Sequence, residues 1–129
     1  MNKSKVLLIM SREIVADSII AQAKANASFE FLAEHDYSAA VRKAIEYRPK
    51  IVIVEVPESG SYRNAENCLR ISDRIRKNLP HAKQLLLCSE TDTASGRVAI
   101  QAKLENRIDD FLFYDTSVNY LFSKLESLI

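Results

Sequence analysis

One carboxylate stands at the end of a strongly apolar segment, and its position suggests chemistry. Residues 50–56 read KIVIVEV, so Glu55 follows four β-branched apolar residues, and Pro57 comes soon after it. Such a run is typical of a strand buried on both faces, and the carboxyl ends of parallel strands are where functional groups gather. We therefore expect Glu55 either to work at the rim of a site or to mark a site that has lost its function.

The cysteines and histidines form no recognisable metal-binding pattern. The spacing of Cys68, His81 and Cys88 matches no zinc motif, and two cysteines are too few for a disulfide framework. We expect Cys68 and Cys88 to be buried structural residues, and His35 and His81 to lie in exposed loops.

Glycine is scarce, which excludes the common nucleotide-binding loops. The chain contains two glycines, Gly60 and Gly96, whereas those loops need several glycines close together to wrap phosphate with backbone N–H groups. Ser59 and Ser61 flank Gly60, but PESGSYR is not the glycine-flanked elbow of a hydrolase. We expect no enzymatic activity.

The composition indicates one globular domain over residues 1–129. Apolar residues make up 47% of the chain and charged residues 27%, an ordinary balance for a soluble protein. The formal net charge of +1 argues against direct nucleic-acid binding, which draws on unbalanced basic charge. No apolar run approaches the roughly 20 residues of a membrane span. We expect a cytoplasmic protein.

Hydrophobic periodicity predicts strands alternating with helices. The expected strands cover residues 5–10, 29–34, 50–56, 83–89 and 109–115, and the expected helices cover 12–26, 38–48, 64–79, 94–106 and a last segment after 117. Ser11 is the expected N-cap of the first helix, and Thr116 or Ser117 that of the last. The alternation predicts an α/β protein, a three-layer α/β/α sandwich around a parallel sheet.

Charged residues on the expected third helix indicate a solvated face. Acid-first pairs four residues apart join Glu66 to Arg70 and Asp73 to Lys77. The basic residues of this helix are Arg70, Arg74, Arg76 and Lys77. Because acids lie among them, we expect a solvated surface and not a nucleic-acid interface.

The whole pattern resembles the receiver domain of two-component response regulators, whose fold is CheY-like (flavodoxin-like). The resemblance covers essentially the whole chain and rests on RPKIVIVEV, SDRIRK and IDDFLFYDTS. It implies a five-stranded parallel sheet in the order 2-1-3-4-5 and a role in phosphorelay signal transduction.

The resemblance also implies a phosphorylation pocket whose positions are mostly degenerate. Glu55 corresponds to the phosphoacceptor aspartate, and Phe111 keeps the aromatic switch position. Most of the other positions have lost the family's chemistry. Met10 and Ser11 stand where the family has two metal-binding acids, and Cys88, or Ser89 in a register shifted by one, stands where it has a hydroxyl. Tyr114 replaces the lysine, and Asp115 replaces the proline.

These replacements predict a pseudo-receiver. Aspartyl phosphorylation needs a divalent cation, and neither Met10 nor Ser11 offers the carboxylate that Mg²⁺ prefers. Glutamate is also one methylene longer than aspartate, which disturbs an in-line geometry. We expect no cofactor and weak or absent Mg²⁺ binding. Glu55 then either imitates a phosphoryl group or is a residual carboxylate, solvated or bonded to Ser11, Ser89 or Tyr114.

The expected function is phosphorylation-independent signalling through protein–protein contact. The partner would be a separate protein or a fused output domain, and a homodimer could form through helix 4, strand 5 and helix 5. The expected interaction face comprises Arg97, Lys103, Arg107, Tyr120 and Lys124. Two alternatives stay open: a phosphoryl-accepting receiver in which Glu13, Glu34 or Asp36 helps bind a cation, and a flavodoxin-like small-ligand binder.

Overall fold

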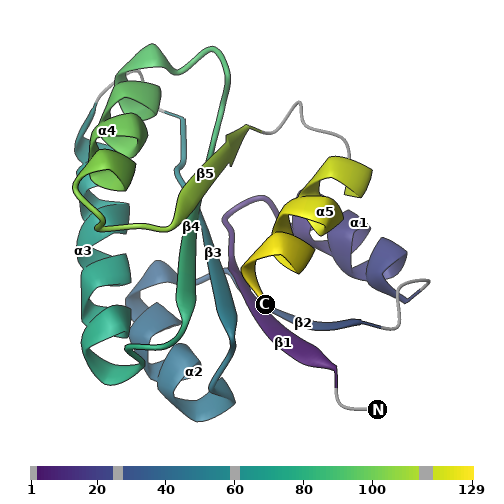
Figure 1. Ribbon diagram of the computed structural model, residues 1–129. Helices are drawn as coiled ribbons and strands as arrows, with labels where there is room; N and C mark the ends of the chain where they lie inside the picture. The colour runs from purple at the N-terminus through teal and green to yellow at the C-terminus, as the bar shows by residue number, and fades with distance from the viewer. Residues whose placement is uncertain (1–2, 25–27, 59–61, 114–117) are drawn as a thin grey trace.

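The computed structural model describes residues 3–24, 28–58, 62–113 and 118–129, in which strands and helices alternate (Figure 1). Five parallel strands form one sheet in the order β2-β1-β3-β4-β5. The strands are β1 (Ser4–Ile9), β2 (Phe29–Glu34), β3 (Ile51–Glu55), β4 (Lys83–Cys88) and β5 (Asp110–Phe113). The helices are α1 (Glu13–Ala23), the short 3₁₀ helix η1 (Tyr37–Ala39), α2 (Ala40–Tyr47), α3 (Tyr62–Asn78), α4 (Thr93–Leu104) and α5 (Val118–Leu128).

Helices cover both faces of the sheet, which confirms the predicted three-layer sandwich. In Figure 1, α2, α3 and α4 lie on one side of the strands, and α1 and α5 lie on the other. Residues of β3 alternate between the two layers: Val52 and Val54 pack under α2–α4, while Ile51 and Ile53 pack under α1 and α5. A strand buried on both faces has no polar side, which explains the unbroken apolar run before Glu55.

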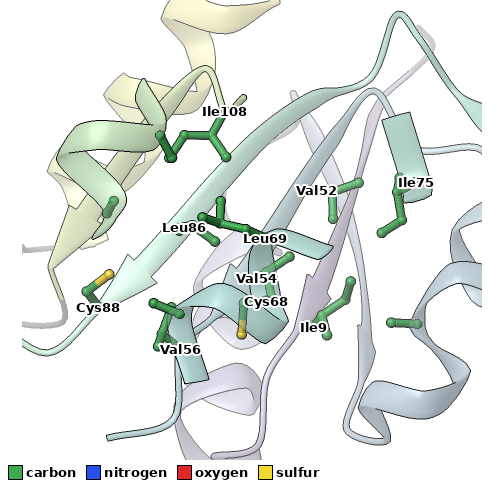
Figure 2. Packing of buried hydrophobic residues seen from close by; sticks show 14 of the residues in the cluster. Ile9, Val52, Val54, Val56, Cys68, Leu69, Ile75, Leu86, Cys88 and Ile108 are labelled. Atoms are coloured by element: carbon green, nitrogen blue, oxygen red, sulfur yellow. The ribbon is translucent and has the colours of Figure 1, made fainter. Parts of the chain in front are cut away.

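The layer under α2–α4 is closely filled by aliphatic side chains from the sheet and from α3. Figure 2 shows Val52, Val54 and Leu86 of the sheet facing Leu69 and Ile75 of α3. All five side chains are essentially inaccessible to solvent. This packing fixes the strands whose carboxyl ends form the candidate site.

Local signals explain how the second helix begins and ends. The predicted helix over 38–48 is divided, because the Asp36 carboxylate accepts a hydrogen bond from the backbone N–H of Ser38 and starts η1. Arg48 then ends α2 in a left-handed conformation with φ of 53°. Pro49 follows and cannot continue a helix.

Ser11 does not cap α1, contrary to the prediction. The N-cap position is Arg12, which makes no side-chain capping bond. The Ser11 hydroxyl instead donates to Glu55 Oε1 at 2.7 Å. The caps predicted at Thr116 or Ser117 lie outside the described residues.

The predicted acid-first pairs on α3 are also wrong. Asp73 accepts a hydrogen bond of 2.8 Å from Arg107, and Arg70 donates to Asn67. The bond to Asp73 raises the pKa of Arg107. The acid therefore ties α3 to the segment between α4 and β5, a contact that spacing along one helix does not reveal. In the described parts of the chain, no helix combines the length and apolar character needed to cross a membrane.

Candidate functional site

Glu55 is the last residue of β3, and its side chain is completely buried. β1 lies next to β3 with Ile9 opposite Val54, so the loop after β1 passes directly beside Glu55. Glu55 Oε1 accepts hydrogen bonds from the backbone N–H of Ser11 at 2.6 Å, the Ser11 hydroxyl at 2.7 Å and the backbone N–H of Arg12 at 3.1 Å. The carboxylate is therefore held by the same loop that would supply metal ligands in the resemblance described above.

Arg12 adds positive charge on the outer side of this carboxylate. Its Nε lies 4.0 Å from Glu55 Oε2, and its terminal nitrogen lies 3.8 Å from Glu58 Oε2. Both ion pairs are long, and the Arg12 side chain is half exposed, so solvent screens them. Ion pairs of this kind contribute little free energy to stability. The geometry nevertheless places the guanidinium between the carboxylates of Glu55 and Glu58.

Hydrogen bonds extend from Glu58 to the loop after β4. Glu58 Oε1 accepts from the Thr91 hydroxyl at 2.9 Å, and the hydroxyls of Thr91 and Ser89 are also 2.9 Å apart. Polar contacts thus connect the loops that follow β1, β3 and β4. Ser89 reaches Glu55 only through this chain of contacts, whereas Ser11 is the direct partner that the sequence suggested. Tyr114 lies outside the described residues, as does Asp115.

The backbone of Glu55 is anchored from the other side. The Tyr37 hydroxyl donates to the carbonyl oxygen of Glu55 and lies 3.3 Å from that of Ile9. The thiol of Cys68 donates to the same Glu55 carbonyl at 3.6 Å. Burial, with the charge of Glu55, raises the pKa of the Tyr37 hydroxyl well above its usual range. Tyr37 therefore stays protonated and connects η1 to the ends of β1 and β3.

Two positions assigned to the degenerate pocket, Met10 and Cys88, pack among core residues. Met10 packs in the apolar layer under α1 and α5, and Cys88 packs in the layer under α2–α4. Both side chains are fully buried, because helices cover both faces of the sheet.

Both thiols have the structural character that the sequence predicted. Figure 2 shows Cys68 and Cys88 within the same apolar layer. Burial raises the pKa of each thiol to about 12, and the charges of Glu55 at Cys68 and Asp92 at Cys88 act in the same direction. The thiolate is the reactive form of cysteine, so neither side chain is activated.

The two histidines differ in exposure: His35 is partly buried and His81 is exposed. Nδ1 of His35 lies 2.7 Å from the Met10 carbonyl oxygen, and its Nε2 lies 3.9 Å from Glu13 Oε1. His35 lies in the loop after β2 as expected, but its side chain is only one-third exposed. His81 is exposed as expected, but it precedes β4, while Cys88 ends it. A metal site made from Cys68, His81 and Cys88 is therefore not assembled.

The acids suggested as substitute metal ligands are engaged locally. Glu34 Oε2 accepts from the backbone N–H of Asp36. Asp36 in turn accepts from the hydroxyl and the backbone N–H of Ser38, and these bonds lower the pKa of Asp36. Glu13 pairs with His35. Nowhere in the described ranges do three or more histidine, cysteine or acidic side chains gather as a metal ion would require.

Three of the five residues expected on the interaction face lie together. A hollow of about 550 Å³ is lined by Lys103 of α4 and by Tyr120 and Lys124 of α5. Asp110 and Phe111 of β5 line the same hollow. The Asp110 carboxylate pairs with Lys103 at 3.0 Å and with Lys124 at 2.8 Å. Phe111, partly buried, packs edge-on against Phe113.

Arg97 and Arg107 do not join that face. Both line the groove between α3 and α4, and Arg107 is held there by its bond to Asp73. Arg107 was expected on the interaction face because it lies just before the predicted fifth strand. Its side chain turns back toward α3, where the acid is.

Sequence reasoning missed several residues that shape the site. The sequence patterns gave no role to Arg12, Tyr37, Glu58 or Thr91. Glu58 carries a weak signal, since a second acid three residues after Glu55 falls within the same connecting loop. Tyr37 carries none, because its bonds to Ile9 and Glu55 span 28 and 18 residues.

Comparison with known proteins identifies the fold. No protein-family model and no curated protein sequence matches the chain. A response regulator from Thermotoga maritima superimposes with a TM-score of 0.78 at 17% identity, covering 99% of this chain and 98% of its own. A response regulator receiver domain protein from Clostridium thermocellum gives 0.79 at 18%, covering 98% and 94%. NtrX from Brucella abortus gives 0.77 at 16%, covering 98% of this chain and 27% of its own, so there the fold is part of a longer chain. The chain thus has the fold of response regulator receiver domains.

Proposed function

We propose that this chain is a receiver-fold domain of two-component signalling that acts through protein–protein contact and does not accept phosphate by the metal-dependent route. One observation carries the proposal: Glu55 Oε1 already accepts three hydrogen bonds from Ser11 and Arg12. The acid at the phosphoacceptor position is therefore engaged by the protein itself.

Phosphoryl transfer to Glu55 would be costly on two counts. A nucleophilic carboxylate oxygen must be free to approach phosphorus in line, with a cation nearby to neutralise charge. Here the donors of the β1–α1 loop occupy one oxygen, and Arg12 lies beside the other. Met10 points into the core, so the loop offers no carboxylate at that position for Mg²⁺. We expect Mg²⁺ to bind weakly or not at all.

In this proposal Glu55 keeps the rim in one arrangement without a phosphoryl group. Its bonds fix the β1–α1 loop, and the contacts through Arg12, Glu58 and Thr91 reach the loop before α4. Partner binding then depends on where and when the protein is present, and not on a phosphorylation cycle. The partner would be a cytoplasmic protein or a fused output domain, and the hollow between α4, β5 and α5 is the candidate face for it or for a second copy.

The decisive experiment offers the protein a small phosphodonor. Acetyl phosphate with Mg²⁺ should leave the intact mass unchanged, and beryllofluoride with Mg²⁺ should leave the amide NMR signals of Ser11, Arg12 and Glu55 in place. A phosphorylatable receiver domain treated in parallel supplies the positive control.

A magnesium-dependent acyl phosphate at Glu55 would contradict the proposal. It would establish the phosphoryl-accepting alternative, in which Glu13, Glu34 or Asp36 helps to hold the cation. The small-ligand alternative stays a prediction.

A further inference from the structure

The amino edge of the sheet, which is the lower edge in Figure 1, carries basic side chains on three neighbouring strands. They are Lys5 of β1, Lys50 directly before β3 and Lys83 at the start of β4, and all three are exposed. The backbone N–H of Lys50 donates to the Lys5 carbonyl at 2.9 Å, and that of Lys83 donates to the Lys50 carbonyl at 2.8 Å. The sheet itself therefore holds these residues side by side.

A preformed hollow of about 230 Å³ lies at the same edge, between the α2–β3 and α3–β4 connections. Its lining combines basic and apolar residues: Arg48, Lys50 and His81 with Pro49, Leu79 and Pro80. Both connections are short and hydrogen-bonded, through Arg48 N–H to Ala44 O at 2.9 Å and Ala82 N–H to Leu79 O at 3.1 Å. A rigid site of this kind loses little conformational entropy when a ligand binds.

The charge of Lys5 already has partners within the protein. Lys5 Nζ lies 3.5 Å from the Tyr47 carbonyl oxygen and 5.2 Å from the centre of the Tyr47 ring. It thereby complements the negative end of the α2 dipole and makes a cation–π contact. Lys5 helps to define the edge but needs no external partner.

The remaining basic residues lack such compensation. Within the described residues, Arg48, Lys50, His81 and Lys83 form no ion pair with an acid, and two acids that lie near this edge in space are already engaged. Glu46 of α2 pairs with Lys43 at 4.0 Å, and Asp109 pairs with Arg76 at 3.2 Å.

The two edges of the sheet differ in their balance of charge, although the whole chain is almost neutral at +1. Acids gather at or just beyond the carboxyl ends of the strands: Glu13, Glu34, Asp36, Glu55, Glu58, Glu90 and Asp92. The amino edge also has the acids Glu30, opposite Lys5, and Asp109, and the carboxyl edge also has Arg12. A separated charge distribution steers an oppositely charged partner toward one face. The amino edge is therefore suited to an anionic partner.

We propose that this amino edge, made of Lys5, Arg48, Lys50, His81 and Lys83 around the hollow, binds an acidic peptide segment of a partner protein. Carboxylates of the peptide would lie against the basic side chains, and one apolar side chain would enter the hollow beside Pro49 and Leu79. A nucleic acid fits this surface less well. Among the residues that line the hollow, the one aromatic ring is the imidazole of His81, whereas binding of a single strand uses several rings on which successive bases stack.

The test is an NMR titration with an acidic pentapeptide, a leucine flanked on each side by two glutamates, with both ends blocked. Amide signals of the non-proline residues in 48–50 and 78–83 should shift, and these shifts should become smaller as salt is added. The variant Lys50→Glu/Lys83→Glu should bind the peptide about tenfold more weakly. The control Lys24→Glu/Arg97→Glu has the same net charge and should bind within about twofold of the unchanged protein, since both residues lie on other exposed surfaces.

Any of five results would overturn the proposal. The first two are equal weakening of binding in both double variants and equal binding of a peptide with glutamines in place of glutamates. The next two are tighter binding of a single-stranded oligonucleotide of the same charge and the absence of any shift at residues 48–50 and 78–83. Concentration-dependent self-association that protects this edge would also overturn it, because a second copy would then be the occupant. The surface lies at the opposite edge from Glu55, so the outcome is independent of phosphorylation chemistry.

Discussion

Glu55 accepts two backbone N–H groups and one hydroxyl on a single oxygen, and this pattern makes it a structural anchor for the β1–α1 loop. Hydrogen bonds to a charged group are shorter and roughly twice as strong as bonds between neutral groups. The side chain is completely buried, whereas its donors in Ser11 and Arg12 come from an exposed loop. The loop is therefore ordered by an acid that is 44 residues distant in the sequence.

Removing the charge at Glu55 should measure this anchoring. Glu55→Gln keeps the shape and one acceptor oxygen but loses the charge assistance, so we expect the free energy of unfolding to fall by about 1–2 kcal/mol. Urea denaturation monitored by circular dichroism gives the value. Glu58→Gln is the matched control, because Glu58 is exposed, and it should change stability by less than about 0.5 kcal/mol.

Equal effects of the two changes would mean that Glu55 stabilises the fold no more than a surface acid does. The same pair of variants can be examined by NMR. Only Glu55→Gln should move the amide signals of Ser11 and Arg12, since these groups donate directly to Glu55.

Asp110 at the start of β5 connects three elements, because it bonds to Lys103 of α4 and Lys124 of α5. Burial alone would raise the pKa of Asp110, but hydrogen bonds from Lys124, Lys103 and the Phe111 backbone outweigh burial and lower it. A carboxyl group whose pKa is lower in the folded state stabilises the protein above the unfolded-state pKa of about 4. That contribution is lost as the pH falls through the folded-state pKa.

Asp110→Asn should therefore destabilise the protein in a pH-dependent way. We expect a loss of about 1 kcal/mol at pH 7 that shrinks toward zero as the pH falls below about 4. Thermal denaturation over this pH range provides the measurement. Asp17→Asn on the exposed face of α1 is the control, and it should leave the pH profile unchanged; a constant difference at every pH would contradict the role assigned to Asp110.

The two apolar layers share one sheet, so the molecule should unfold as a unit. Leu69 of α3 and Leu125 of α5 are both fully buried, but they belong to opposite layers. Each Leu→Ala substitution should lower the free energy of unfolding by about 3 kcal/mol. Because every central strand contributes side chains to both layers, either change should move a single transition.

Urea unfolding followed by far-ultraviolet circular dichroism and by tyrosine fluorescence would test this cooperativity. The two probes should give coincident curves for the unchanged protein and for each variant. Separate transitions in the Leu125→Ala variant would show that α1 and α5 dissociate from the sheet independently.

The sequence determined the sheet, the alternating helices and the place of Glu55, because hydrophobic periodicity and strand ends are local properties. β2 has the bounds that were predicted, and the other elements differ by a few residues where a cap or a 3₁₀ turn decides the end. Burial of Cys68 and Cys88 follows from the same periodicity.

Only the tertiary structure decided which groups meet. Ser11 leaves its capping role for Glu55, and Asp73 takes Arg107 as its partner, because contacts across the fold compete with those along one helix. Charges that are mixed along the chain are also partly sorted in space, with most of the acids named above at the carboxyl edge and several basic residues at the amino edge. Parallel strands collect every carboxyl end at one edge of the sheet and every amino end at the other, and no linear pattern displays that sorting.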